Sequence, residues 1–113
     1  MSRDNAIVLD ILKSVKLANE FVGNLNKEAF FQDLKTQSAV LHQLLLAGEA
    51  VKRLSGSFRN AHPEVPWKNV AGMRDVLIHQ YDDVDLEEVW KTIRVEAPKL
   101  IALLEPLVLR IER

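Results

Sequence analysis

The sequence predicts an all-α protein, an antiparallel bundle of four or five helices that forms one domain over residues 1–113. Apolar residues recur at helical spacing through most of the chain, and no stretch alternates between apolar and polar residues as a half-buried strand would. Glycines and prolines divide the periodic segments and predict short connections. With 113 residues, 48% of them apolar, the chain is long enough to bury one hydrophobic core.

The first predicted helix follows Asp4, a candidate N-cap, and ends at Gly23 and Asn24, which favour helix termination. Its buried face is predicted to consist of Ile7, Val8, Ile11, Leu12, Val15, Ala18 and Val22. Asn26 is then a candidate cap for a short helix that carries two phenylalanines.

A second long helix is predicted from about Thr36 to Leu54, with an apolar stripe of Val40, Leu44, Ala47, Val51 and Leu54. Gly48 interrupts this stripe at a cost of about 1 kcal/mol relative to alanine, so we expect a close helix contact there. The following SGSFRNAHPEVPW stretch is predicted to be irregular, and Pro66 suits the first turn of the next helix.

The next helix is predicted from about Pro66 to Tyr81, and its apolar side contains an arginine. Arg74 shares that side with Val70, Leu77, Ile78 and Tyr81. On an ideal helix His79 is rotated roughly 140° from Arg74, so the two side chains do not converge. They could meet if the helix end is distorted, or if a two-fold axis brings up a second copy of the same helix.

Two further helical segments complete the predicted bundle. Asp85 and Glu88 form an acidic variant of the capping box and open one helix. Pro98 is expected to kink or divide it. The final segment is predicted to bury Leu100, Leu104, Leu107 and Ile111.

Composition excludes several classes of protein. Without cysteine there can be no disulfide, thiolate metal site or cysteine nucleophile. No apolar run approaches the roughly 20 residues of a membrane span, and Asp4 and Asp10 interrupt any signal-peptide pattern. We therefore expect a soluble cytoplasmic protein that has no membrane association.

The net charge of −1 argues against a general polyanion binder. A nucleic-acid surface would have to be a local patch, for which the candidates are Lys52, Arg53, Arg59, Lys68 and Arg74. The alternative is that these residues belong to solvated helix faces.

No metal site is expected. Asp82, Asp83 and Asp85 lack the glycine and the distal glutamate of a calcium loop, so solvation and helix capping are the expected roles. His42 and His62 have no partner at zinc-ligand spacing.

The run RDVLIHQY, from Arg74 to Tyr81, has the pattern arginine, four residues, histidine, any residue, tyrosine. It resembles the signature of HEPN-domain ribonucleases, specifically the HepT-like toxins of toxin–antitoxin pairs. The segments LLLAGEAVKRLS, HPEVPWKNVAGMRD and HQYDDVDLEEVW extend the resemblance over residues 44–90. The flanking helices fit the same fold.

The resemblance implies RNA cleavage by a homodimer without a metal or other cofactor, leaving a 2′,3′-cyclic phosphate. His79 would act as general base or acid, and Arg74 would stabilise the transition state. These residue types suit the roles, since imidazole titrates near neutrality and guanidinium offers a charged donor fork to phosphate. Asp75 would orient one of them, and Tyr81 would bind phosphate or shape the cleft. Many members carry asparagine where this chain has Asp75, which adds negative charge beside Arg74.

The resemblance also implies a partner, a small nucleotidyltransferase antitoxin that silences the toxin by attaching AMP to Tyr81. Two alternatives remain open. One is a non-catalytic HEPN module that binds nucleotide or a nucleotidyltransferase. The other is a helical scaffold in which Arg74 pairs with Asp75 or Glu49, His79 caps helix carbonyls and Tyr81 only closes the apolar stripe.

Overall fold

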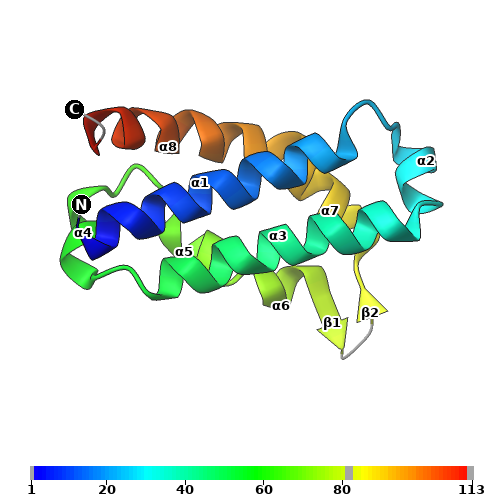
Figure 1. Cartoon of the computed structure of the whole chain (residues 1–113). Helices are drawn as coiled ribbons and strands as arrows, with labels where there is room; N and C mark the ends of the chain where they lie inside the picture. The colour runs from blue at the N-terminus through cyan, green and yellow to red at the C-terminus, as the bar shows by residue number, and fades with distance from the viewer. Residues whose placement is uncertain (1, 81–82, 112–113) are drawn as a thin grey trace.

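The helices run alternately up and down the long axis of the molecule (Figure 1). The computed structural model describes residues 2–80 and 83–111, with only the backbone of Ile111. In chain order the elements are α1 (Arg3–Val22), α2 (Lys27–Phe31), α3 (Leu34–Lys52), α4 (Gly56–Ala61), α5 (Trp67–Ala71), α6 (Met73–Leu77), β1 (Ile78–Gln80), β2 (Asp83–Val84), α7 (Leu86–Lys91), the π-helical turn η1 (Thr92–Glu96) and α8 (Ala97–Ile111). The long units are α1, α3, the α5–α6 pair and the continuous α7–η1–α8 stretch, so the predicted antiparallel helical bundle is confirmed.

The centre of the bundle is α1, which packs against both α3 and α8. Every residue predicted for the apolar stripes of the first two long helices is buried. Full burial of a large aliphatic side chain contributes about 1.5–3 kcal/mol, so these stripes account for much of the stability. The close contact expected at Gly48 is also confirmed, because a Cβ there would lie 2.8 Å from the carbonyl oxygen of Val70 on α5.

Helix ends follow the predicted chemistry, with one exception. Gly23 ends α1 with φ of 55°, and Asn26 caps α2. The prediction that Asp4 caps α1 is wrong, because Ser2 does so. The Asp4 carboxylate instead accepts hydrogen bonds from the backbone N–H of Ser55 (2.9 Å) and its hydroxyl (2.7 Å). It thereby ties the start of α1 to the N-cap of α4, a short helix within the stretch predicted to be irregular.

The prediction of one helix from Pro66 to Tyr81 is wrong. The helix breaks at Gly72 and ends at Leu77, after which β1 pairs antiparallel with β2. Ile78 lies opposite Val84 in this hairpin. Strands of three and two residues are too short to show an alternating pattern, so the expectation of no strand is corrected as well.

The kink or division expected at Pro98 takes the form of a π-helical turn, η1, just before it in an otherwise continuous helix. Proline has no N–H to donate to the carbonyl of Arg94, and the wider hydrogen bonding of η1 accommodates the defect just before it. Beyond it, Leu100, Leu104 and Leu107 are buried as predicted. The side chain of Ile111 lies outside the described residues.

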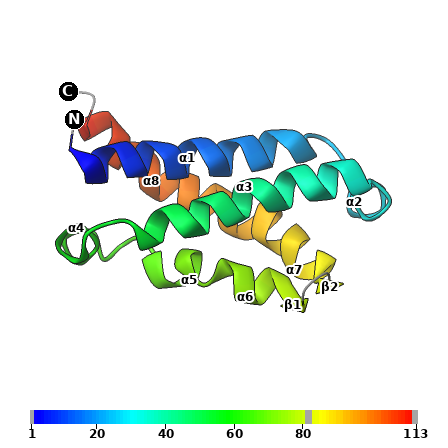
Figure 2. The same ribbon diagram turned by 60° about the horizontal axis from the view of Figure 1, so that its bottom comes forward.

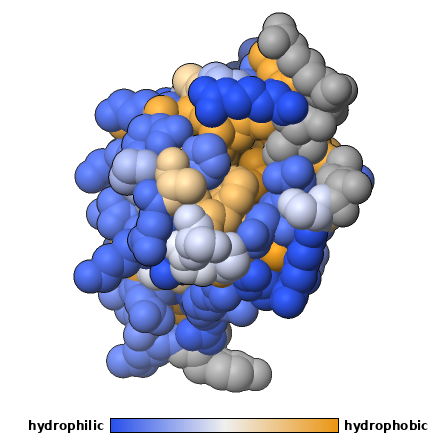
Figure 3. All heavy atoms as spheres, turned by 90° about the vertical axis from the view of Figure 1, so that its left-hand side faces the viewer, coloured by the Kyte–Doolittle hydropathy of each residue, from blue (hydrophilic) through white to orange (hydrophobic). Residues whose placement is uncertain are grey.

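The hairpin projects from the bundle beyond α6, beside the start of α7 (Figures 1 and 2). The opposite end of the bundle, with both termini and α4, is mainly hydrophilic around a small apolar recess (Figure 3). No helix of the described residues is both long enough and apolar enough to cross a membrane.

Candidate active site

The hairpin places His79 across from the residue that opens α7. After Leu77 the backbone becomes extended, and the N–H of Ile78 donates to the carbonyl of Arg74. The N–H of Asp85 donates to the carbonyl oxygen of Leu77 at 2.8 Å, which closes the base of the hairpin. As a result, His79 on β1 and Asp85 before α7 lie side by side although they are six positions apart in the sequence.

His79 and Asp85 form an ion pair with a distance of 2.7 Å from Nε2 to Oδ2. The hydrogen bond that the His79 imidazole donates to the Asp85 carboxylate raises the pKa of His79 above its usual 6.5. Reciprocally, the hydrogen bond with His79, followed by one from the backbone of Glu88, lowers the pKa of the Asp85 carboxyl. The His79 side chain is 54% exposed, so the ring remains open to a ligand while one nitrogen is held.

Arg74 lies on α6, directly before the hairpin, and is exposed. No ion pair among the described residues includes it, and the candidate partner Glu49 pairs with Lys52 at 3.2 Å instead. Asp75 beside it is also exposed. The guanidinium and the His79 imidazole thus sit on consecutive elements without a direct hydrogen bond in the described part of one chain. Tyr81 lies outside the described residues.

The structure separates the three candidate RNA-binding residues. Arg53 follows α3 and Arg59 belongs to α4, at the end of the bundle away from the hairpin (Figure 1). Lys68 lies on α5, on the same side of the bundle as α6. One chain therefore does not gather the predicted basic patch around Arg74, and RNA binding by these residues stays a prediction.

A groove of about 640 Å³ separates α5–α6 from α7–η1–α8. Apolar side chains form much of its lining, among them Val70, Met73, Val76, Leu100 and Leu103. Its charged lining residues are balanced, comprising Glu64, Lys68, Glu88, Lys91, Glu96 and Lys99. Because Asp85 caps the backbone N–H of Glu88, the groove begins next to the His79–Asp85 pair.

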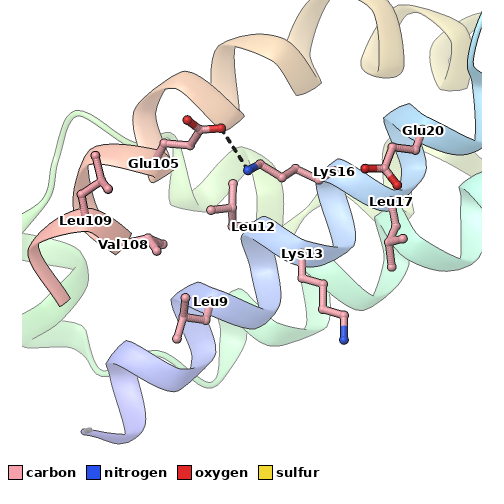
Figure 4. Close-up of a pocket in the computed structure, with 9 residues that line it drawn as sticks. All are labelled: Leu9, Leu12, Lys13, Lys16, Leu17, Glu20, Glu105, Val108 and Leu109. Carbon is pink, nitrogen blue, oxygen red and sulfur yellow. Dashed lines mark ion pairs between the residues drawn. The ribbon is translucent and has the colours of Figure 1, made fainter. Parts of the chain in front are cut away.

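A second groove, of about 490 Å³, runs between α1 and α8 (Figure 4). The ion pair from Lys16 to Glu105 spans it at 3.1 Å, and the exposed Leu109 lies on its α8 side. None of the predicted site residues that the structure describes lines this groove.

Asp85 is the site residue that the sequence did not reveal. The predicted cap is confirmed, since its Oδ1 accepts the N–H of Glu88 at 3.1 Å, but the contact with His79 was not foreseen. The available signal was a pair of β-branched residues, Ile78 and Val84, on either side of a polar turn. Within the described residues no three acidic or histidine side chains are grouped to hold a metal ion, and Asp82 lies outside them.

Comparison with known proteins gives a consistent result. A family model described as ribonuclease HepT-like matches residues 11–107. A protein of Thermococcus cleftensis named probable ribonuclease HepT is 42% identical over 98 residues, which cover 87% of this chain and 89% of the relative. A protein of Methanocaldococcus jannaschii whose name proposes an RNase is 38% identical over 107 residues, which cover 95% and 88%. No solved structure matches the chain.

The family model spans most of the chain, and the relatives align over most of their own length. The predicted resemblance and the predicted class of enzyme, a ribonuclease, are therefore confirmed. The chain belongs to the HepT-like ribonuclease family.

Proposed function

We propose that this protein is the toxin of a toxin–antitoxin pair and that it cleaves RNA without a metal ion, using Arg74 and His79. The observation that carries the proposal is the His79–Asp85 pair, an exposed imidazole held by a carboxylate on a projecting hairpin. An exposed arginine lies on the element just before it. This pairs a proton-transfer group with a positive charge on the preceding element, and both are needed for attack on a phosphodiester.

In the proposed reaction the ribose 2′-hydroxyl attacks the adjacent phosphorus and the bond from phosphorus to the 5′-oxygen breaks. His79 transfers a proton, while the Arg74 guanidinium donates hydrogen bonds to the phosphate oxygens as negative charge builds up. Asp75, next to Arg74, would help to orient that side chain. The products are a 2′,3′-cyclic phosphate and a free 5′-hydroxyl.

The proposal includes a homodimer, because one described chain places Arg74 and His79 on consecutive elements, α6 and β1, without joining them. Val76 lies two residues from Arg74, is 51% exposed and lines the groove between α5–α6 and α7–η1–α8. Three lysines and three glutamates line the same groove, so this face can pair with a copy of itself across a two-fold axis. Such a pairing would bring two sets of site residues to one cleft.

The proposed antitoxin is a small nucleotidyltransferase that attaches AMP to Tyr81, two residues after His79. A bulky anionic group at that position would occupy the space in which a substrate phosphate must bind. The proposal places the protein in the cytoplasm with its RNA substrate. Coexpression with the candidate antitoxin and intact-mass measurement should show the added adenylate, and Tyr81→Phe should remove it; an unmodified wild-type mass would contradict this part.

The proposed activity is tested by incubating the purified protein with total RNA in the presence of EDTA. His79→Ala should reduce cleavage by about 10²–10⁴-fold, the usual contribution of a general acid or base. His42→Ala is the matched control, because His42 is also exposed but belongs to α3 and, among the described residues, makes no hydrogen bond or ion pair with the hairpin. Equal cleavage by both variants would refute the assignment. Binding of RNA or nucleotide without cleavage would favour the non-catalytic module.

A further inference from the structure

We propose that Asp85 is a positioning residue for proton transfer at His79, which it holds through Nε2 so that Nδ1 is the nitrogen that exchanges a proton with RNA. This inference rests on the proposed ribonuclease function and deepens it. The HepT-like signature from Arg74 to Tyr81 does not include Asp85.

The Asp85 carboxylate is fixed on both of its oxygens. Oδ1 accepts the backbone N–H of Glu88 at 3.1 Å, and Oδ2 contacts Nε2 of His79 at 2.7 Å. Its own backbone N–H donates to Leu77 at 2.8 Å. Because the cap of α7 and the base of the hairpin both restrain Asp85, its second oxygen presents a fixed acceptor to the imidazole.

The contact determines which nitrogen of the ring is reactive. An ionised carboxylate can only accept hydrogen bonds, so Nε2 of His79 must carry the proton that it donates to Asp85. The remaining proton site of the ring is then Nδ1. No hydrogen bond among the described residues uses that atom, and the side chain is half exposed.

The surrounding charges favour the protonated ring. Besides Asp85, Asp83 on β2 and Glu88 on α7 raise the pKa of His79, whereas partial burial opposes them. Helix α6 also contacts β1 and carries one charge of each sign, Arg74 and Asp75. A raised pKa keeps more of the imidazole protonated near neutral pH, which favours a role for His79 as the acid.

The proton balance follows. The 2′-oxygen forms its bond to phosphorus and releases its proton to water, while the bond to the 5′-oxygen breaks. The Nδ1 proton of the His79 imidazolium goes to that departing oxygen. His79 then regains a proton at Nδ1 from water. Throughout, Nε2 keeps its own proton and donates it in the hydrogen bond to Asp85.

Asp85→Asn tests the proposal with little change in shape. Asparagine is as good an N-cap as aspartate, so α7 should remain capped. The new amide donates to Nε2, however, which moves the neutral ring's proton to Nδ1 and removes the negative charge. Asp33→Asn is the matched control, because Asp33 caps α3 through the N–H of Thr36 and, among the described residues, makes no hydrogen bond with His79.

We expect Asp85→Asn to lower kcat by about 10²-fold, the lower end of what general acid–base catalysis contributes, with little change in KM. The alkaline limb of its pH–rate profile should move to lower pH. An RNA substrate whose 5′-bridging oxygen is replaced by sulfur needs no protonation of the leaving group, so it should be cleaved by this variant and the wild type at similar rates. Asp33→Asn should match the wild type on both substrates.

The outcomes separate the two levels of the argument. If the wild type cleaves RNA but Asp85→Asn keeps full kcat and an unmoved pH profile, the positioning role is overturned and the ribonuclease stands. If the wild type cleaves nothing, the proposed function fails. The contact is then still tested by NMR titration of His79, whose pKa should fall in Asp85→Asn and stay constant in Asp33→Asn. An equal pKa in all three proteins overturns the pairing itself.

Discussion

Along α1 the predicted apolar stripe is buried against α3 and α8, whereas the described side chains of the hairpin Ile78–Val84 are all exposed or half-buried. The first region is stabilised by many apolar contacts. The second is held by backbone pairing, by the N–H of Asp85 on the carbonyl of Leu77, and by one ion pair. Two short strands are marginal on their own, so the hairpin depends on the helices at its base.

The difference separates the residues that stabilise the fold from those proposed to act on RNA. Side chains in the core are fixed by packing and cannot reach a substrate. His79 and Arg74 are exposed, at the place where the helical pattern of α6 ends. Substitutions in the two regions should therefore have different consequences.

The largest effect on stability is expected from the core. Ile11 is fully buried at the centre of α1, and Ile11→Ala should lower the free energy of unfolding by about 2–5 kcal/mol through lost burial and a cavity. His79→Ala should change it by no more than about 0.5 kcal/mol, because the side chain is exposed. Urea denaturation measures both changes. If His79→Ala destabilises the protein as much as Ile11→Ala, the distinction between core and hairpin is wrong.

The core was predictable from the sequence because each stripe repeats over several turns. The buried residues of α1 and α3, the contact at Gly48 and the cap at Asp85 all follow from local spacing or local chemistry.

The hairpin was not predictable in the same way. Ile78 continues the apolar period of the preceding helix, so the helical pattern itself does not mark the change to an extended backbone, and the β-branched pair Ile78 and Val84 is a weak signal beside it. The contact between His79 and Asp85 joins residues across a turn and becomes visible only with the pairing of β1 and β2. Likewise, the position of Asp4 at the start of α1 predicts a cap, because its true partner, Ser55, is too distant in the sequence to be recognised from local spacing.

The next effect concerns the surface on which two chains would pair. Val76→Glu places a charge on the apolar face beside Arg74 and should weaken the proposed dimer by about 3 kcal/mol, or roughly 100-fold. Leu109→Glu is the matched control, because Leu109 is 63% exposed beside the other groove (Figure 4). Sedimentation velocity distinguishes the variants. Dissociation by Leu109→Glu alone would move the interface to α1 and α8.

A smaller effect is expected at Gly48, where the core and the helices before the hairpin touch. The added Cβ of Gly48→Ala would meet a backbone carbonyl at 2.8 Å, so α5 must shift. We expect a loss of about 1–3 kcal/mol despite the better helix propensity of alanine. Thermal unfolding measures it; a gain in stability would show that α5 moves away freely.

The smallest effect is the dependence of stability on pH that the ion pair contributes. The pKa of His79 is raised on folding. The contribution of His79 to the free energy of unfolding is therefore complete below pH 6.5 and is lost as the pH rises through the folded-state pKa. The pKa of Asp85 is lowered on folding. The contribution of Asp85 to stability is therefore complete above pH 3.8 and is lost on further acidification. The difference in stability between wild type and Asp85→Asn should therefore be largest between these values. A difference that is constant from pH 4 to 9 would count against the pair, although solvent and salt keep the effect small.

The central claim, that two chains build one RNA-cleaving cleft, is tested most directly by mixing two inactive variants. Arg74→Ala and His79→Ala, each with a different affinity tag, are unfolded together, refolded and purified through both tags in turn. If the cleft takes residues from both chains, the mixed dimer keeps one intact guanidinium and one intact imidazole there, and RNA cleavage should return. A doubly tagged dimer that remains as inactive as either parent would contradict the account.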